Sequence, residues 1–162
     1  MTVNTPSAPT LKVRPGPAGQ CDLVVQSGAR GVGRLALDAT LLSPLLIALG
    51  TDRRAETDDV LPLALTAPQG AAEPLGARRG WVGDVLLSNG ERLGSRTWLL
   101  ERAKRTPETA RRAERYASEA CQPIADYHGM EVTAQAAWAG RGVLRVGVQA
   151  GGVSLVQTVP VS

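Results

Sequence analysis

The chain contains no phenylalanine, and aromatic residues make up only 3% of its 162 residues. A hydrophobic core therefore has to be built from Leu, Val, Ala and Ile. The few large side chains available to it are Trp81, Trp98, Trp138, Tyr116 and Tyr127. Hydrophobic residues (43%) and charged residues (20%) occur at the frequencies of an ordinary globular protein, and a chain of this length can bury one sizeable core.

Residues that commonly carry catalysis or hold metals are also scarce. His128 is the only histidine, and it lies where a helix is expected to end, so a structural role suits it better than a place in a catalytic triad. The two cysteines, Cys21 and Cys121, lie far apart and form no CxxC or Cys/His cluster. This spacing offers no metal ligand set, and it predicts unpaired thiols rather than a disulfide.

Two further patterns fail as catalytic or cofactor sites. The glycine-rich segment 28–33 lacks the Lys-Ser/Thr of a phosphate-binding loop. The acids Glu56, Asp58 and Asp59 lie in a polar segment without the apolar pocket that a general acid requires. We therefore predict that the protein is not an enzyme and that it has no catalytic, cofactor or metal site.

Charge and hydropathy argue against two classes of partner. A formal net charge of +3, with acids and bases mixed along the chain, does not indicate nucleic-acid binding. No apolar run approaches the ~20 residues of a membrane-spanning helix, and the N-terminus does not resemble a signal peptide. We expect the protein in the cytoplasm of the cell that makes it, with neither nucleic acid nor membrane as partner.

The order of segments predicts an α+β fold. Residues 1–20 contain four prolines, a composition that favours an extended and loose arm. Residues 21–162 are expected to form one domain, in which an antiparallel or mixed β-sheet with a C-terminal meander packs against two to three helices. Residues from about 50 to 80, rich in charge, Pro and Gly, are predicted to form a long loop, and such loops are usually functional or ordered by a partner. No internal repeat is evident.

Two helices have clear signals. Leucines at helical spacing predict a helix over about 40–49, with Asp38 or Thr40 capping it and Pro44 in its first turn. The sequence Thr106-Pro107-Glu108 predicts the start of a second helix, which Pro123 should end or kink.

Side-chain spacing and alternation predict the remaining contacts and strands. Ion pairs Glu108–Arg112 and Arg115–Glu119 are expected on the outer side of the second helix. A short helix is expected at 98–102. Alternating residues predict strands at 22–25, 33–37, 132–138, 143–148 and 153–157.

The charged segment Asp52-Arg53-Arg54 is the first candidate for function. It directly follows a buried helix, and two adjacent guanidinium groups can make bidentate contacts with a partner. Two alternatives are a solvated charge cluster and an internal salt bridge between Asp52 and Arg79. Trp81, which follows Arg79, is equally well explained as a core residue placed after a turn.

Four motifs in order resemble those of the small baseplate protein of Mu-like contractile phages. They cover about residues 20 to 157, and their order and spacing are specific in combination. The proline-rich arm and the insert from Leu61 to Gly76 have no counterpart in this resemblance. The motifs are Leu49-Gly50-Thr51-Asp52-Arg53-Arg54-Ala55, Arg79-Gly80-Trp81-Val82-Gly83-Asp84, Gly94 to Lys104, and Thr106-Pro107-Glu108-Thr109.

The resemblance implies a structural role. The group is similar to the baseplate wedge and sheath-initiator proteins of contractile tails and to the type VI secretion component TssE. It implies that the chain docks to other wedge proteins and helps to start the tail sheath. The implied partners also include the sheath protein and tube or hub proteins. The implied location is the tail baseplate of the virion, after assembly in the host cytoplasm. The docking residues that it implies are Asp52, Arg53, Arg54, Arg79, Trp81 and Asp84.

Two other functions remain open at this stage. The first is a small basic nucleic-acid-binding module or another cytosolic interaction module. A nucleic-acid-binding module would depend on Arg111, Arg112 and Arg115 and would bind DNA with a steep salt dependence. A lysozyme-like enzyme would need two carboxylates across a cleft, and the sequence shows no such pair. A further expectation is that sheath subunits add strands to the edge of the C-terminal meander.

Overall fold

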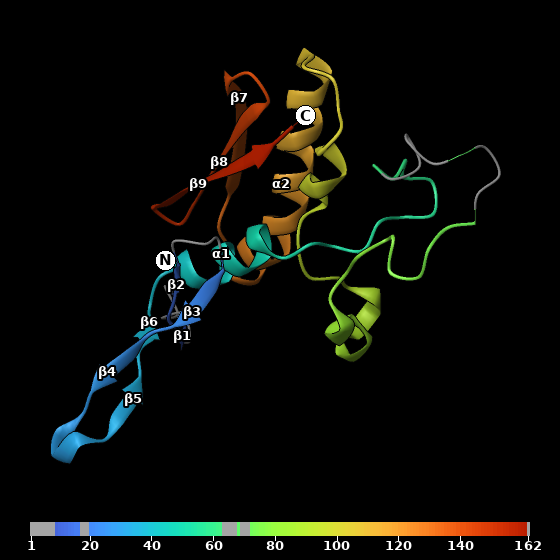
Figure 1. Cartoon of the computed structure of the whole chain (residues 1–162). Helices are drawn as coiled ribbons and strands as arrows, with labels where there is room; N and C mark the ends of the chain where they lie inside the picture. The colour runs from blue at the N-terminus through green and yellow to red at the C-terminus, as the bar shows by residue number, and fades with distance from the viewer. Residues whose placement is uncertain (1–8, 17–19, 63–67, 69–71, 162) are drawn as a thin grey trace.

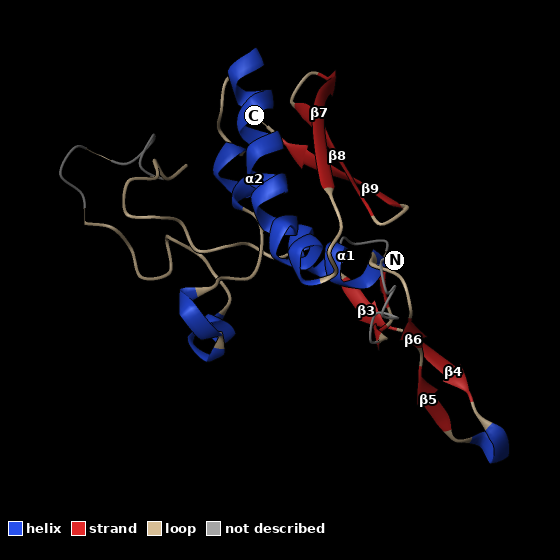
Figure 2. Cartoon of the chain, turned by 180° about the vertical axis from the view of Figure 1, so that it is seen from behind, coloured by secondary structure: helices blue, strands red, loops and turns tan. Residues whose placement is uncertain are grey.

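A computed structural model describes residues 9–16, 20–62, 68 and 72–161. The fold is α+β, as predicted. Its body consists of a three-stranded antiparallel meander, β7 (Val132–Gly140), β8 (Val143–Ala150) and β9 (Val153–Pro160), and two helices, α1 (Leu42–Gly50) and α2 (Pro107–Tyr127). Helix α2 lies along one face of the meander, and α1 packs against α2 and β9 (Figures 1 and 2). No helix of the described residues is long and apolar enough to cross a membrane.

The core lies between α2 and the central strand. Leu144, Val146 and Val148 of β8 are fully buried, and they alternate with residues on the open face of the sheet. They form one cluster with the small residues Ala113, Ala117 and Cys121 of α2 and with Leu45 and Leu100. The alanine stripe thus lets the helix approach the sheet closely. Trp98 and Tyr116 are buried as predicted, but Tyr127 and Trp81 are 81% and 43% exposed, so the expectation that they fill the core is wrong.

Both predicted helix starts are confirmed, and of the two effects predicted for Pro123 the end of the helix is wrong. The Oγ1 atom of Thr106 accepts a hydrogen bond from the backbone N–H of Thr109 at 3.1 Å, and Pro44 lies in the first turn of α1. Pro123 does not end α2, which continues to Tyr127. The proline ring is exposed, and the buried residues Cys121 and Ala125 on either side hold this part of the helix against the core.

The two cysteines are unpaired among the described residues, as expected. Cys21 is exposed, whereas Cys121 is buried in the core. Burial raises the pKa of the Cys121 thiol to about 12, so this thiol stays protonated at neutral pH.

The predicted loop from 50 to 80 has no helix or strand in its described residues. Much of the insert between Leu61 and Gly76 lies outside the described residues, as do residues 1–8 and 17–19 of the predicted arm. After the loop come three 3₁₀ helices, Val82–Leu86, Ser88–Gly90 and Arg96–Leu100, of which only the last overlaps a predicted helix.

The described residues between 9 and 38, called the arm below, form short two-stranded ribbons that project from the body (Figure 1). Its strands are β1 (Thr10–Leu11), β2 (Val13–Pro15), β3 (Cys21–Leu23), β4 (Val25–Ser27), β5 (Gly33–Leu35) and β6 (Leu37–Asp38), with a 3₁₀ turn at Ala29–Gly31. They pair as β1–β6, β2–β3 and β4–β5. The expectation of a loose N-terminal segment is therefore wrong for residues 10–15, which belong to hydrogen-bonded strands. The predicted division into an arm of residues 1–20 and a domain of residues 21–162 stays a prediction.

The three ribbons of the arm meet in a cyclic junction that the sequence analysis missed. The backbone N–H of Lys12 donates to the carbonyl of Ala36 at 2.9 Å, that of Ala36 to Val24 at 2.8 Å, and that of Val24 to Lys12 at 3.0 Å. The three residues are spaced twelve apart, and each stands in a related triplet: Leu11-Lys12-Val13, Leu23-Val24-Val25 and Leu35-Ala36-Leu37. This is a short internal repeat with approximate threefold arrangement.

Asp38 fastens the arm to α1. Its carboxylate accepts hydrogen bonds from the hydroxyl of Ser43 at 2.6 Å, from the backbone N–H of Ser43 at 3.1 Å, and from the hydroxyl and N–H of Thr40. The Ser43 hydroxyl in turn accepts from the N–H of Val13 at 3.1 Å. Burial alone would raise the pKa of Asp38, but these donated hydrogen bonds outweigh it and lower the pKa to about 2.

Replacement of Asp38 by alanine should destabilise the fold by about 1–3 kcal/mol, because it leaves the buried donors of Ser43 and the partly buried donors of Thr40 without this acceptor. The folded-state pKa lies below the ordinary value of 3.8, so the carboxylate stabilises the fold above that pH, and this contribution is lost as the pH falls from 3.8 towards 2. Urea unfolding at pH 7 and at pH 2 to 3 measures the effect. The difference in the free energy of unfolding between parent and variant should shrink at low pH, and an undiminished difference would contradict the assignment. The control is Asp22→Ala, at an exposed site of the arm.

Candidate docking surface

The segment that contains Asp52, Arg53 and Arg54 leaves α1 and is fixed beside residues 94–95. The N–H of Arg53 donates to the carbonyl of Ser95 at 3.0 Å, and the N–H of Ser95 donates to the carbonyl of Thr51 at 2.8 Å. Gly94 allows this approach, since its φ is +110° and a Cβ atom there would lie 2.4 Å from the Thr51 oxygen. The backbone positions of the charged side chains are therefore well defined.

Asp52 belongs to a network around Arg79. The guanidinium of Arg79 donates to Asp52 at 2.8 Å, contacts Glu101 at 2.9 Å and lies 4.5 Å from the centre of the Trp98 ring. Burial would lower the pKa of Arg79, but the carboxylates of Asp52 and Glu101 outweigh it and raise the pKa. The internal salt bridge between Asp52 and Arg79, considered above as an alternative to docking, is present.

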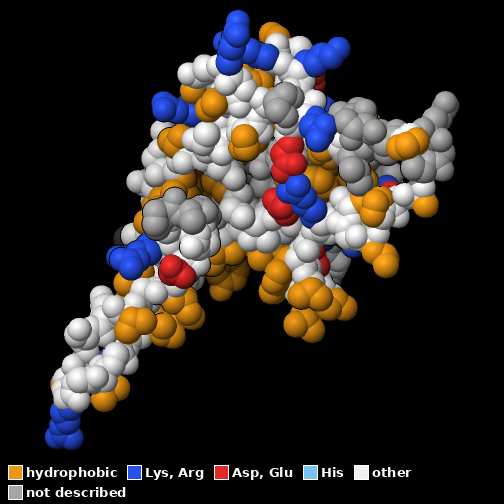
Figure 3. Space-filling model, viewed as in Figure 1, with side chains coloured by type: hydrophobic (Ala, Val, Ile, Leu, Met, Phe, Trp, Pro, Cys, Tyr) orange, Lys and Arg blue, Asp and Glu red, His pale blue; other side chains and the backbone are white. Residues whose placement is uncertain are grey.

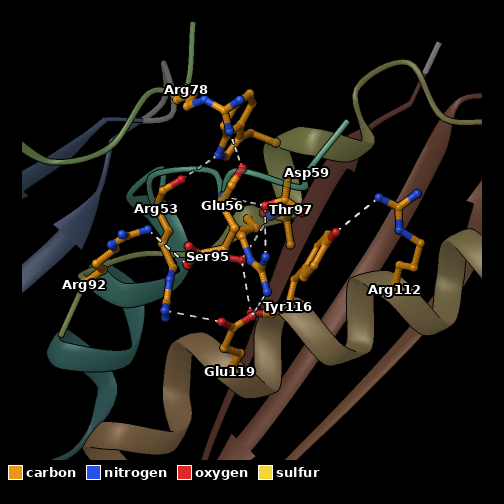
Figure 4. Close-up of polar contacts among 12 residues, drawn as sticks. Arg53, Glu56, Asp59, Arg78, Arg92, Ser95, Thr97, Arg112, Tyr116 and Glu119 are labelled. Atoms are coloured by element: carbon orange, nitrogen blue, oxygen red, sulfur yellow. Dashed lines mark hydrogen bonds and ion pairs between the residues drawn. The ribbon is translucent and has the colours of Figure 1, made fainter. Parts of the chain in front are cut away.

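Arg53 belongs to a second network, which joins the loop to α2 (Figure 4). Glu119 on α2 contacts Arg53 at 3.4 Å and Arg96 at 2.7 Å, and Arg96 also contacts Asp59 at 2.9 Å. The Arg96 side chain is 16% exposed, and its guanidinium lies 4.8 Å from the centre of the Tyr116 ring. The two carboxylates raise the pKa of Arg96 against the effect of burial.

The two ion pairs predicted on α2 do not form as expected. Glu119 turns to Arg96 and Arg53 instead of pairing with Arg115. Glu108 approaches Arg111 at 3.8 Å, while Arg112 donates to the hydroxyl of Tyr116 at 3.1 Å. Tertiary contacts thus override the local spacing rule.

Arg54 differs from Asp52 and Arg53 because its exposed side chain is not engaged by a described partner. It forms no hydrogen bond or ion pair with the part of the chain that the structure describes. Gly80 packs directly against it, and a Cβ atom at Gly80 would lie 2.7 Å from the Cβ of Arg54. The backbone and Cβ of Arg54 therefore lie beside Gly80 at the start of the Trp81 segment, and its guanidinium is not paired with any described residue.

Trp81 leads into an exposed apolar surface. Its ring, 43% exposed, lies over Gly83, where any Cβ atom would clash with it at 2.2 Å. Val82, Val85 and Leu86 on the following 3₁₀ helix are 89%, 82% and 83% exposed. We call these four residues the Trp81–Leu86 patch. Figure 3 shows the hydrophobic side chains on the projection below the body, where Figure 1 places this helix.

Asp84 makes a hydrogen bond that stabilises the same segment. One carboxylate oxygen accepts a hydrogen bond from the N–H of Leu93 at 2.9 Å, and the other is buried. Asp84 therefore holds the 3₁₀ helix against the following loop.

Of the six sequence-predicted site residues, only Arg54 and Trp81 are thus available to a partner without breaking a described ion pair or side-chain hydrogen bond. Asp52, Arg53, Arg79 and Asp84 are engaged within the chain. Val82, Val85 and Leu86 were missed, although their spacing of i, i+3 and i+4 is that of an apolar helical stripe. No group of three or more potential metal ligands occurs in the described residues.

Comparisons with known proteins agree with the sequence motifs. The family described as Phage protein GP46 matches residues 41–154. The baseplate protein gp46 of Escherichia phage Mu is 44% identical over 85 residues, which cover 52% of this chain and 50% of that protein. The Mu-like prophage FluMu protein gp46 of Haemophilus influenzae is 34% identical over 108 residues, 67% of this chain and 61% of that protein. The match spans about half of the first relative and about three fifths of the second, and it confirms the resemblance to Mu-like phages.

Proposed function

The chain belongs to the GP46 family of phage proteins, and we propose that it is a structural component of a phage tail baseplate. Its role is to dock to other baseplate proteins. One relative carries the name baseplate protein, and the six candidate docking residues all lie within the segment that matches the family. The observation that carries the proposal is the exposed Trp81–Leu86 patch beside the unpaired Arg54.

The chemistry of this surface suits a protein partner. Exposed valine, leucine and tryptophan side chains gain free energy on burial, and aromatic and arginine residues are the ones that most often dominate binding at interfaces. The two ion-pair networks behind the surface join the loop to α2 and the 3₁₀ helix at Arg96–Leu100. They fix Arg79, two residues before Trp81, and so restrain the start of the segment that carries the patch, which lowers the ordering cost of association.

A finer proposal is that the chain is a wedge protein of a contractile tail and helps to start the sheath. Within the described residues β9 pairs only with β8, so no described strand occupies its other edge, where a sheath subunit would add a strand. Tube or hub proteins are further candidate partners. The chain would reach its place in the virion after assembly in the host cytoplasm.

Reversal of charge at Arg54 tests the docking role. Arg54→Glu should lower the affinity for the baseplate partner about tenfold, because it replaces a free cation at the rim of the apolar patch with an anion. The stability of the isolated chain should not change, since Arg54 forms no described ion pair. Co-expression with each of the other baseplate proteins, followed by affinity measurement on the purified pairs, gives the result.

The control is Arg111→Glu, a change at an exposed arginine on α2 whose nearest carboxylate lies at 3.8 Å. Arg53→Glu is unsuitable, because it would place an anion beside Glu119 and disturb the fold. Equal affinities for parent and Arg54→Glu in every pair would rule out Arg54 as a docking residue.

A further inference from the structure

A basic pocket lies at the end of the body where α2 begins. It has a volume of about 370 Å³ and is formed by residues 102–105, by the turn between β7 and β8, and by Val161. Figure 3 shows Lys and Arg side chains gathered at the upper end of the body, where Figure 1 places the start of α2 and this turn. The cations that line the pocket are Arg102, Lys104, Arg105 and Arg141.

These four cations have no carboxylate partner in the part of the chain that the structure describes. All four residues are exposed, and none forms an ion pair with a described residue. The acids that flank them in the sequence have other contacts, since Glu101 contacts Arg79 at 2.9 Å and Glu108 approaches Arg111 at 3.8 Å. The pocket therefore concentrates positive charge that an anionic group can neutralise.

The same pocket has an apolar part that is fixed in place. Trp138, Ala103 and Val161 line it together with the cations. The indole N–H of Trp138 donates to the carbonyl of Thr106 at 3.3 Å, and the backbone N–H of Val161 donates to the carbonyl of Gly142 at 2.8 Å. Because these walls are already ordered, an occupant does not have to arrange them on binding.

Cationic and apolar groups thus line one pocket, and the guanidinium of Arg105 lies 5.7 Å from the centre of the Trp138 ring. An occupant that satisfies both carries carboxylates and an apolar side chain close together. A protein segment with Asp or Glu beside an apolar residue has this composition, and carboxylates pair with arginine through two parallel hydrogen bonds. A nucleic acid would instead require cations spaced along its backbone, whereas these line a volume that holds only a few side chains.

We propose that the basic pocket binds an acidic segment of another baseplate protein. Asp or Glu side chains of that segment contact the four cations, and an apolar side chain packs against Trp138. The choice of a baseplate protein rests on the function proposed above. The pocket shares no residue with the Trp81–Leu86 patch, so it provides a second contact with the baseplate.

Carbodiimide crosslinking of assembled tails tests the proposal. The reagent joins a lysine amine directly to a carboxylate as an amide, with loss of water and without a spacer. Lys12 and Lys104 are the only two lysines of this sequence, and both are exposed. Lys12→Arg therefore leaves a single lysine, which lines the pocket. Lys104→Arg is the matched control, because it keeps the charge of the pocket and removes the amine.

In tails that contain the Lys12→Arg chain, Lys104 should be joined to Asp or Glu side chains in one segment of another baseplate protein. The Lys104→Arg chain should enter tails equally well and should lose this crosslink.

Affinity for the purified partner so identified provides the second readout. Lys104→Glu/Arg141→Glu should weaken binding at least about tenfold and reduce its dependence on salt, because it reverses two of the four cations. The control Arg34→Glu/Arg145→Glu makes the same change in net charge at exposed sites of β5 and β8, and its affinity should stay within about threefold of the parent value. The midpoint of urea unfolding should change little in both variants, since none of the four side chains forms a described ion pair. Ala103→Leu, which narrows the pocket and keeps every cation, should also weaken binding.

Each other outcome overturns the proposal. Crosslinks from Lys104 only to carboxylates of this chain, or of a second copy of it, would assign the pocket to the chain itself. Binding of the purified chain to DNA or to vesicles of anionic lipid, if Lys104→Glu/Arg141→Glu abolishes it and the control retains it, would assign the pocket to a polyanion. Equal weakening by the pocket variant and its control would show that only net charge matters.

Two results separate this inference from the proposed function. Tails that contain the Lys12→Arg chain but yield no Lys104 crosslink would overturn the inference and leave the proposed function intact. Tails that never contain the chain would overturn both.

Discussion

Replacing Arg96 with alanine is expected to lower the free energy of unfolding by about 3 kcal/mol, because the change leaves Asp59 and Glu119 as partly buried carboxylates without their closest cation. Arg96 is 16% exposed and Asp59 11% exposed, so solvent cannot fully replace the lost contacts. The substitution also removes the guanidinium that lies over the ring of Tyr116. Urea unfolding followed by tryptophan fluorescence measures the change.

The matched control is Arg111→Ala on the outer side of α2. Arg111 and Glu108 are 74% and 66% exposed and their charged atoms are 3.8 Å apart, so the loss of this pair should cost less than about 0.5 kcal/mol. If the two variants were equally stable, the network around Glu119 could not be what joins the loop to α2.

The double variant Val85→Asp/Leu86→Asp is expected to reduce binding to the baseplate partner by about 100-fold or more, since it places two charges in the centre of the Trp81–Leu86 patch. Both side chains are more than four fifths exposed, so the free energy of unfolding should stay within about 0.5 kcal/mol of the parent value. Calorimetric titration of the parent and variant chains with the purified partner gives the ratio.

Tyr127→Asp serves as the control for this effect. Tyr127 is 81% exposed at the end of α2, and the change likewise puts an acid in place of a large exposed side chain. Loss of binding in both variants would point to a general effect of added negative charge. Full binding by Val85→Asp/Leu86→Asp would show that the patch is not the docking surface.

The body of the fold could be predicted from the sequence because its signals are local and agree with one another. Thr106-Pro107 defines the start of α2 through a side-chain cap and a proline at the first helical position. Alternation of apolar and polar residues defines the three strands of the meander, and glycines supply its turns. These features hold whatever else the chain contacts.

The arm could not be predicted in the same way. Its strands are two or three residues long, and the cyclic hydrogen bonds join Lys12, Val24 and Ala36, which are separated by whole ribbons. The related triplets around these residues share only a leucine and an aliphatic residue, a pattern too short to stand out before the structure brings them together.

For the candidate docking surface, the sequence analysis named residues beside the exposed patch and offered the Asp52–Arg79 salt bridge as an alternative, but it did not predict the contacts that engage Arg53. The motif with Asp52, Arg53 and Arg54 lies beside the exposed patch, but the partners that engage Asp52 and Arg53 come from distant elements. Arg79 lies 27 residues after Asp52, and Glu119 lies 66 residues after Arg53. Local spacing favoured Arg115 as the partner of Glu119, and only tertiary packing reverses that choice.

Electron microscopy of tails assembled with this chain tests the central claim most directly. The account predicts density for the chain within the baseplate, with Trp81, Val85 and Leu86 buried against a second baseplate protein and Arg54 at the rim of that contact. Tails that assemble without the chain, or a bound chain whose Trp81–Leu86 patch faces solvent, would contradict it.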